Sequence, residues 1–547
     1  MSQRTRFIVG TLLIVLFGYG LFWWFGMHQP RPAVSTESLR PSDDTRTLAL
    51  ATPAETLALE NGQTLDLTIA PVKHTINGQA VTMLGYNGSL PGPTLRVKQG
   101  TEVSINLKNG GDIPTTLHAH GIRMENAFDG VPGMTQEAIA PGETFVYRLK
   151  FPDAGAFWYH PHVRTDYTVE AGLYGSILVA PAIAAYWPPV NREVPLMLDD
   201  IALDANGLLS FDAKIPNHTL MGRFGTTMLV NGATDYRLEA KAGEIVRLYL
   251  TNAANTRLFN FSIPGTRLKL IGADGGRYEQ ETFVESVLLA PGERRIVDVL
   301  FETPGTYPLQ HTTPEKTYAL GTVSVSTDNA SPSWVKEYST LRKNASDGDE
   351  LRRLITAHSN RSPDKQLSLL LDMSAEMRRG MPQGMHMMGD GMGMSDAGMG
   401  MGDDGEAFEW EDTMARMNTL STSETLEWKL VDTMTGKKNM AIDNWIFQQG
   451  DQVKIRIFND PQSMHPMQHP IHFHGQRFIV LATNGKVNET PVWLDTTLIA
   501  KGDTVDILLD ASNPGEWMAH CHILEHAEGG MMMPFTVVGA KETKMQQ

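Results

Sequence analysis

Short runs of alternating apolar and polar residues, separated by glycine, proline and asparagine, fill the chain from Leu57 onward. This pattern is typical of β-strands that bury one face in a sandwich domain. A pair of strands joined by a glycine turn recurs at 95–107, 238–250 and 446–457. A second turn precedes a further strand at Ala140-Pro-Gly-Glu-Thr-Phe, Ala290-Pro-Gly-Glu-Arg-Arg and Ala500-Lys-Gly-Asp-Thr-Val. The sequence therefore predicts an all-β chain with three consecutive, related β-sandwich domains.

The repeats also predict where the domains begin and end. The segment 331–404 departs from the pattern, with one or two helices expected at 333–358 and many methionines at 373–402. Such a biased segment is either a flexible linker or, because thioethers prefer Cu(I), a segment that recruits copper. The predicted organisation is an anchor or signal (1–27), a tether (28–52), three domains (53–185, 186–330 and 405–547) and the linker 331–404.

Residues 7–27 form an uncharged apolar run that follows Arg4 and Arg6. The run is long enough to span a bilayer, and the flanking arginines favour a cytoplasmic N-terminus. The bulky residues 22–25 stand where a cleavage site would have small residues, which favours a retained anchor over a cleaved signal peptide. Both alternatives stay open, and both place the rest of the protein outside the cytoplasm.

Composition narrows the classes of function. The net charge of −16 argues against a nucleic-acid-binding protein, which would present a basic face. With 41% hydrophobic residues, the chain is too apolar to be wholly disordered. Cys521 is the single cysteine, so no intramolecular disulfide can form. An unpaired thiol in an oxidising compartment needs another role, and metal ligation supplies one.

Ten of the 17 histidines fall into four compact motifs. These motifs lie at equivalent places in the first and third repeats, whereas the middle repeat has Phe259 and Phe261 in place of one pair and retains His311 alone. The middle domain is therefore predicted to hold no metal of its own. The motifs are His-Ala-His at 118–120, His-Pro-His at 160–162, His-Pro-Ile-His-Phe-His at 469–474 and His-Cys-His-Ile-Leu-Glu-His at 520–526.

Residues i and i+2 of a strand point to the same side, so each motif can direct two imidazoles toward one face. Eight imidazoles are too many for one ion and suit three metals. This predicted cluster comprises His118, His120, His160, His162, His472, His474, His520 and His522. The thiolate points to the opposite face, where two histidines and a weak methionine ligand would make a blue-copper centre rather than a zinc site. That set is Cys521, His469, His526 and Met531, with Met532 and Met533 as alternatives to Met531.

Together the four motifs resemble those of the multicopper oxidases, a family of Greek-key cupredoxin domains. The resemblance covers 57–325 and 405–540, and the methionine-rich insert around Met387 and Met388 is similar to that of bacterial copper-efflux and copper-resistance oxidases. It implies four copper ions per chain: one type 1, one type 2 and a type 3 pair. It assigns the blue-copper set to type 1, His118 and His472 to type 2, and the other six cluster histidines to type 3.

The resemblance also implies a reaction. A reductant gives single electrons to type 1 copper, and Cys521 passes them to His520 and His522, so that four electrons and four protons convert O2 to water. Asp129 stands where such oxidases carry an acidic residue for proton transfer, although Asp-Gly is also an ordinary turn. Ala527 replaces a second glutamate of the copper-efflux oxidases, which leaves Glu528, one place on, as the substitute.

The physiological reductant is either Cu(I) or a small molecule. Met467, two residues before His469, matches a methionine that binds substrate Cu(I) in copper-efflux oxidases, while His465 replaces their aspartate. Packing roles in the core or in loops are the alternative for all of these side chains. The candidates for Cu(I) binding are Met464, Met467, Asp412, Met414 and Met417.

We therefore expect a periplasmic or otherwise extracytoplasmic oxidase that converts Cu(I) to Cu(II) with O2 in copper tolerance. If residues 7–27 are retained, the protein is anchored to the inner membrane. The alternatives are a laccase that oxidises phenols and a copper-sequestering protein without catalysis. A copper nitrite reductase is disfavoured, because the trinuclear set is complete and the repeats number three rather than two.

Overall fold

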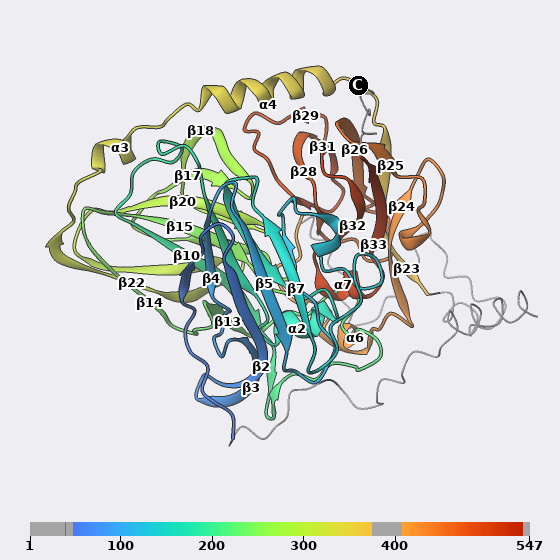
Figure 1. Cartoon of the computed structure of the whole chain (residues 1–547), viewed down its shortest axis with the longest axis horizontal. Coiled ribbons are helices and arrows are strands. Elements are labelled where there is room, and N and C mark those ends of the chain that lie inside the picture. Colours follow the sequence, from blue (N-terminus) through green and yellow to red (C-terminus); the bar gives the residue numbers. More distant parts are fainter. Residues whose placement is uncertain (1–38, 40–46, 375–406, 540–547) are drawn as a thin grey trace, which may run out of the picture.

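Seven β-sheets carry the described part of the chain, residues 39, 47–374 and 407–539, in the computed structural model (Figure 1). Six of the sheets pack in pairs around three hydrophobic cores, which confirms the all-β prediction. The apolar run 7–27 and the methionine-rich segment, except for Met373 and Ser374, lie outside the described residues. Among the residues that are described, no helix is long and apolar enough to cross a membrane.

The first sandwich supplies two of the four histidine motifs. Its sheets share a core that includes Leu67, Leu95, Ile105 and Ile177. One sheet has the order β3 (Gln79–Tyr86), β2 (Thr64–Ile76), β5 (Glu102–Asn109) and β7 (Thr144–Lys150). The other has the order β1 (Thr56–Ala58), β4 (Thr94–Lys98), β9 (Gly175–Ala180), β8 (Gly155–His160) and β6 (His118–His120).

The middle sandwich buries Phe259 and Phe261, the residues that replace a histidine pair, in its own core. One sheet has the order β13 (Thr227–Val230), β10 (Arg192–Ile201), β15 (Glu244–Asn252), β20 (Arg294–Phe301), β17 (Leu268–Ala273) and β18 (Gly276–Val284). The other has the order β14 (Tyr236–Ala242), β22 (Thr317–Asn329), β21 (Gly305–Thr312), β16 (Phe259–Ser262) and β19 (Ser286–Leu289). The seventh sheet is the hairpin of β11 (Leu203–Asp204) and β12 (Gly207–Leu208).

The third sandwich carries the other two histidine motifs. One sheet has the order β24 (Leu426–Asp432), β23 (Lys365–Met373), β26 (Asp451–Asn459), β31 (Thr504–Ala511), β28 (Arg477–Thr483) and β29 (Lys486–Val487). The other has the order β25 (Ile446–Gln448), β33 (Met532–Val538), β32 (Gly515–Cys521), β27 (His469–Phe473) and β30 (Thr496–Ile499). Short helices lie in the loops of the first and third sandwiches: η1 (Asn126–Phe128), α2 (Thr165–Glu170), α6 (Ala415–Leu420), η2 (Asn439–Ala441) and α7 (Leu524–Glu528).

Strand β23 lies inside the segment 331–404 that the sequence assigned to a linker. It pairs with β26 in parallel and with β24 in antiparallel register. Its alternate residues Leu367, Leu369 and Leu371 are buried in the third core. We therefore place the start of the third sandwich at residue 365 rather than 405, and the methionine-rich segment becomes an insertion between two neighbouring strands. The other domain boundaries stay as proposed.

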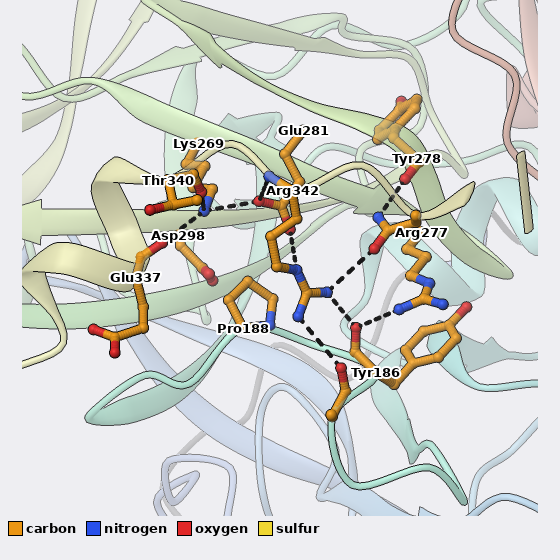
Figure 2. Close-up of polar contacts among 12 residues, drawn as sticks. Tyr186, Pro188, Lys269, Arg277, Tyr278, Glu281, Asp298, Glu337, Thr340 and Arg342 are labelled. Carbon is orange, nitrogen blue, oxygen red and sulfur yellow. Dashed lines mark hydrogen bonds and ion pairs between the residues drawn. The ribbon is translucent and has the colours of Figure 1, made fainter. Parts of the chain in front are cut away.

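Two helices follow the middle sandwich, α3 (Val335–Ser339) and α4 (Ala345–His358), within the range where helices were predicted. Helix α4 contacts both β18 and β28, so it bridges the middle and third sandwiches along one edge of the molecule (Figure 1). Figure 2 shows the ion pairs and hydrogen bonds that hold the segment between α3 and α4 against the middle sandwich. Lys269 lies 2.8 Å from Glu281 and donates to the carbonyl of Thr340 at 2.7 Å, while Arg342 also pairs with Glu281 at 3.0 Å.

Replacing the buried carboxylate at this junction is expected to destabilise the fold. The variant Glu281→Gln removes the carboxylate that pairs directly with the buried Lys269 ammonium and leaves only the charge of Asp298, which already pairs with Arg247, at a cost of about 3 kcal/mol. The exposed pair of Asp235 with Arg237 supplies a matched control, since Asp235→Asn is expected to cost about 0.5 kcal/mol or less. Urea denaturation of both variants gives the comparison, and equal midpoints would contradict a supporting role for the buried pair.

Candidate metal centres

The histidine motifs of the first and third sandwiches meet face to face. His118 lies opposite His160 in the pairing of β6 with β8, and His472 lies opposite His520 in the pairing of β27 with β32. Rings from the two sandwiches then stack across the junction. The ring centroids of His118 and His474 are 4.0 Å apart, and those of His120 and His472 are 3.7 Å apart. Neither sandwich alone therefore completes the cluster.

The eight imidazoles fall into three groups whose ligand atoms lie within 4.8 Å of one another. Each group draws on both sandwiches, and His474 belongs to two of them. The grouping divides the six histidines assigned to type 3 into two sets of three, a division that the motifs alone did not predict. The groups are His118 with His472 and His474, His120 with His160 and His522, and His162 with His474 and His520.

Protein acceptors occupy one ring nitrogen of most of these histidines. The Nδ1 atom of His118 lies 2.8 Å from the Asp129 carbonyl, and that of His160 lies 2.8 Å from the Pro161 carbonyl. A proton on Nδ1 leaves the lone pair on Nε2. The inward Nε2 atoms that are buried without a hydrogen-bond partner belong to His118, His120, His160, His162, His472 and His522.

Such unpaired nitrogens fit metal ligands. A buried polar atom without a partner destabilises a fold by about 1–3 kcal/mol unless something satisfies it. Burial also lowers the pKa of His120, His160, His162, His472 and His522, that of His162 to about 3, so that these five rings are neutral at physiological pH. Neutral imidazole is the form that coordinates a transition metal.

A second centre lies at the end of β32. The Sγ atom of Cys521 is 3.5 Å from Nδ1 of His469 and 4.0 Å from Nδ1 of His526, and all three residues are buried. Met531, the predicted axial ligand, is buried in the same core, and its carbonyl accepts the Cys521 N–H at 3.1 Å. Burial raises the pKa of the Cys521 thiol, so a thiolate forms here only where a cation compensates its charge.

The residues His520-Cys521-His522 connect the two centres through the main chain. His520 and His522 belong to two different groups of the cluster, while the intervening thiol belongs to the second centre. This arrangement matches the alternation predicted from the strand period. The type 1, type 2 and type 3 assignments of the individual side chains remain predictions.

The two proposed proton-transfer carboxylates occupy different surroundings. Asp129 is fully buried, and its Oδ2 atom accepts a hydrogen bond from Nδ1 of His474 at 2.8 Å. Glu528 lies on α7 and accepts the Thr165 N–H at 2.7 Å. Burial, together with the negative charge of Asp166, raises the pKa of Glu528 to about 7. Glu528 can therefore exchange a proton near neutrality.

The candidates for Cu(I) binding range from the core that contains Cys521 to the protein surface. Met467 is buried in the core that contains Cys521, and Met414 packs against that core from outside. Met417 and Met464 are 47% and 45% exposed. Asp412 has a local structural role, because its carboxylate accepts the Met414 N–H at 3.0 Å and the Asn418 amide at 2.9 Å.

Two residues beside the cluster were not predicted from the sequence. The Asp495 Oδ1 atom lies 3.3 Å from Nδ1 of His120 and 3.4 Å from Nδ1 of His472, and Arg294 forms an ion pair with the same carboxylate. Asp495 lies about twenty residues after the motif at 469–474, and no sequence pattern around it indicates a role at the cluster. Arg294 does stand out in the sequence, because the first and third repeats have Thr144 and Thr504 at the equivalent position.

The comparisons with known proteins agree with this geometry. Family models described as multicopper oxidase match residues 68–183, 200–339 and 411–541. Multicopper oxidase mco of Staphylococcus aureus is 27% identical over 470 residues, 83% of this chain and 84% of the relative. The copper resistance protein A homolog of Pseudomonas syringae pv. tomato is 25% identical, and the match covers 88% of this chain and 93% of the relative. The crystal structure of a multi-copper oxidase from Pseudomonas thermotolerans matches with a TM-score of 0.63 and 26% identity, and the match covers 89% of this chain and 100% of that structure.

Removing the thiolate is expected to remove one copper ion and the blue colour. In Cys521→Ser the hydroxyl does not replace a thiolate ligand, so copper content should fall from about four to about three ions per chain. Metal analysis and the visible absorption spectrum measure both effects. Ile457→Val, in the same core, is the control and should keep the blue absorption. A Cys521→Ser protein that stays intensely blue would overturn this assignment.

Proposed function

Because the chain belongs to the multicopper oxidase family, we propose that its physiological reaction is the oxidation of Cu(I) to Cu(II). The chain is a copper-dependent oxidoreductase that uses O2 as the electron acceptor. In the proposed reaction, four Cu(I) ions, one O2 and four protons yield four Cu(II) ions and two water molecules. The purpose would be copper tolerance outside the cytoplasm, with residues 7–27 acting as an export signal or membrane anchor.

When bound, the resident copper ions supply one-electron transfer and the reduction of O2. In the proposed mechanism, His469, Cys521, His526 and Met531 would hold one copper ion, and the eight cluster histidines would hold the other three. The main chain links Cys521 to His520 and His522, which would give electrons a covalent path between the two sites. Asp129 fixes the His474 ring and is placed to move protons at the cluster.

Met467 is the observation that carries the choice of Cu(I). A thioether is a soft ligand with a preference for Cu(I), and this one lies two residues before the type 1 ligand His469 in a shared core. The neighbouring His465 has a buried Nε2 atom without a hydrogen-bond partner. Burial, together with the positive charge of Lys501, lowers the pKa of His465 to about 4, so its ring is neutral at physiological pH. Met467 and His465 would form the inner part of a substrate site, with Met414, Met417 and Met464 further out.

The relatives are compatible with this proposal but do not decide it. A copper resistance protein A homolog matches 88% of the chain, which agrees with a role in copper tolerance, and a putative laccase of Oryza sativa subsp. japonica matches with the same identity and the same coverage of this chain. Oxidation of phenols and sequestration of copper without catalysis are the outcomes that would contradict it.

Removal of the Met467 thioether should impair Cu(I) oxidation selectively. We expect Met467→Leu, which keeps the volume of the side chain, to lower kcat/KM for Cu(I) by about tenfold, equivalent to about 1.4 kcal/mol. Turnover of a phenol, followed as O2 consumption, should be unchanged. Met83→Leu, a buried methionine in the first core, is the control for general effects.

Three results would contradict the proposed substrate. The first is an equal loss of Cu(I) and phenol turnover in Met467→Leu. The second is a wild-type protein that oxidises phenols far better than Cu(I). The third is a copper-loaded protein that consumes no O2 with either reductant, which would favour sequestration.

The proposed proton donor predicts a pH dependence. Glu528 has a pKa near 7, so it is protonated below this pH and loses its proton as the pH rises through it. We expect kcat to fall across that range in the wild type, and Glu528→Gln to lower kcat at pH 6 by about tenfold and to abolish the transition. Asp166→Asn removes a negative charge that raises this pKa, so the transition should move to lower pH. An unchanged pH profile in Glu528→Gln would exclude this residue as the donor.

A further inference from the structure

Arg294 lies at the junction of all three sandwiches. It is the first residue of β20 in the middle sandwich, and its side chain is fully buried. Its Nε atom donates to the carbonyl of Ala156 in the first sandwich at 3.0 Å. Its Nη1 atom donates to Oδ1 of Asp495 in the third sandwich at 2.8 Å, and Nη2 bonds to Oδ2 of the same carboxylate. A planar guanidinium that binds both carboxylate oxygens fixes the orientation of the partner as well as its charge.

Asp495, which Arg294 holds, contacts one cluster histidine from the first sandwich and one from the third. Asp495 Oδ1 lies 3.3 Å from Nδ1 of His120, and the Asp495 main-chain carbonyl accepts from Nδ1 of His472 at 2.8 Å. An acceptor on Nδ1 selects the tautomer whose Nε2 atom is free to bind a metal. Asp495 therefore sets the tautomer and the direction of two rings that come from different domains.

Close packing leaves the Arg294–Asp495 pair no alternative position. A Cβ atom on Gly121, where φ is +83°, would lie 2.2 Å from Oδ2 of Asp495 and 2.8 Å from Nη2 of Arg294. A Cβ atom on Gly292, two residues before Arg294, would lie 2.8 Å from the His522 ring. The glycine of the His-Ala-His-Gly motif and the glycine of the middle turn are thus both required by the approach of the middle domain to the cluster.

Asp274, in the middle sandwich, is a second acidic residue that binds both Arg294 and Asp495. Asp274 accepts the main-chain N–H of Arg294 at 3.0 Å and that of Asp495 at 3.2 Å. Asp274 Oδ1 also lies 3.6 Å from Nη1 of Arg294. The guanidinium therefore lies near two carboxylates, and neither Asp495 nor Arg294 is buried without a counter-charge.

We propose that Arg294, from the domain that holds no copper, is a positioning residue for the trinuclear cluster and acts through Asp495. The middle repeat has only His311 at the motif positions, and where the other two repeats carry threonine it provides the arginine that orients ligands of the other two domains. The inference rests on the family assignment and is independent of whether Cu(I) is the substrate.

Copper retention provides the test. We expect Arg294→Met to weaken binding of the most labile cluster copper by about 10–100-fold, the usual effect of removing a partner of a metal-bound histidine. The measurement is copper content and the type 2 electron paramagnetic resonance signal during titration with a chelator. The blue absorption of the type 1 centre should be retained, because Cys521, His469 and His526 do not contact Arg294.

Arg247→Met is the matched control. Arg247 is also a buried arginine of the middle sandwich, and it binds both oxygens of Asp298 at 2.8 and 3.0 Å, away from the cluster. The control should lower thermal stability without changing copper retention. If Arg294→Met does not fold, Arg294→Lys keeps the charge but loses the second hydrogen bond, and it should show a smaller loss of cluster copper.

A double variant establishes whether Arg294 acts through Asp495. Asp495→Asn should itself weaken retention of cluster copper, and Arg294→Met combined with Asp495→Asn should lose little more than Asp495→Asn alone. Three results would overturn the proposal: wild-type copper retention in Arg294→Met, an equal loss of cluster copper in Arg247→Met, or fully additive losses in the double variant. None of these readouts depends on turnover of Cu(I).

Discussion

Buried imidazole nitrogens without protein partners are the constraint on which this structure depends. The cluster exists only where the first and third sandwiches meet, and at that junction the rings stack closely while several Nε2 atoms are excluded from water and from every protein donor. Each such atom opposes folding by about 1–3 kcal/mol until it is satisfied. Metal binding and the closure of this junction are therefore coupled, as in other proteins whose ligands come together only in the folded state.

The middle sandwich shows how a domain can keep a role after it loses its metal ligands. Phe259 and Phe261 fill its own core, so this pair of positions offers no imidazoles. Buried residues of the domain nevertheless reach the surroundings of the metal centres. The Asn255 amide donates to Glu525, the residue before His526, and Arg294 holds Asp495 beside the cluster. The middle domain thus contributes residues that hold the neighbours of the metal ligands, and not the ligands themselves.

The sequence was sufficient to predict what depends on local spacing. The period of two along a strand predicted the separation of Cys521 from its neighbouring histidines, and the repeat predicted three sandwiches. It did not predict how the six type 3 imidazoles divide into two groups, because that depends on how two domains approach each other. Asp495 was missed for the same reason. Strand β23 was missed although Leu367, Leu369 and Leu371 alternate as in other strands, because the adjacent methionine-rich segment dominated the interpretation of that region.

The position of that segment has a consequence for how such a protein can vary. It is inserted between β23 and β24, which are hydrogen-bonded neighbours with Met373 opposite Leu426. The ends of the insertion are held by the ladder whatever lies between them, and the entropy of closing a loop rises only slowly with its length. The insertion can therefore be lengthened, shortened or exchanged between relatives while the strand register, and with it the copper geometry, stays the same. The length of the insertion and the geometry of the copper sites can in this way change independently within one domain.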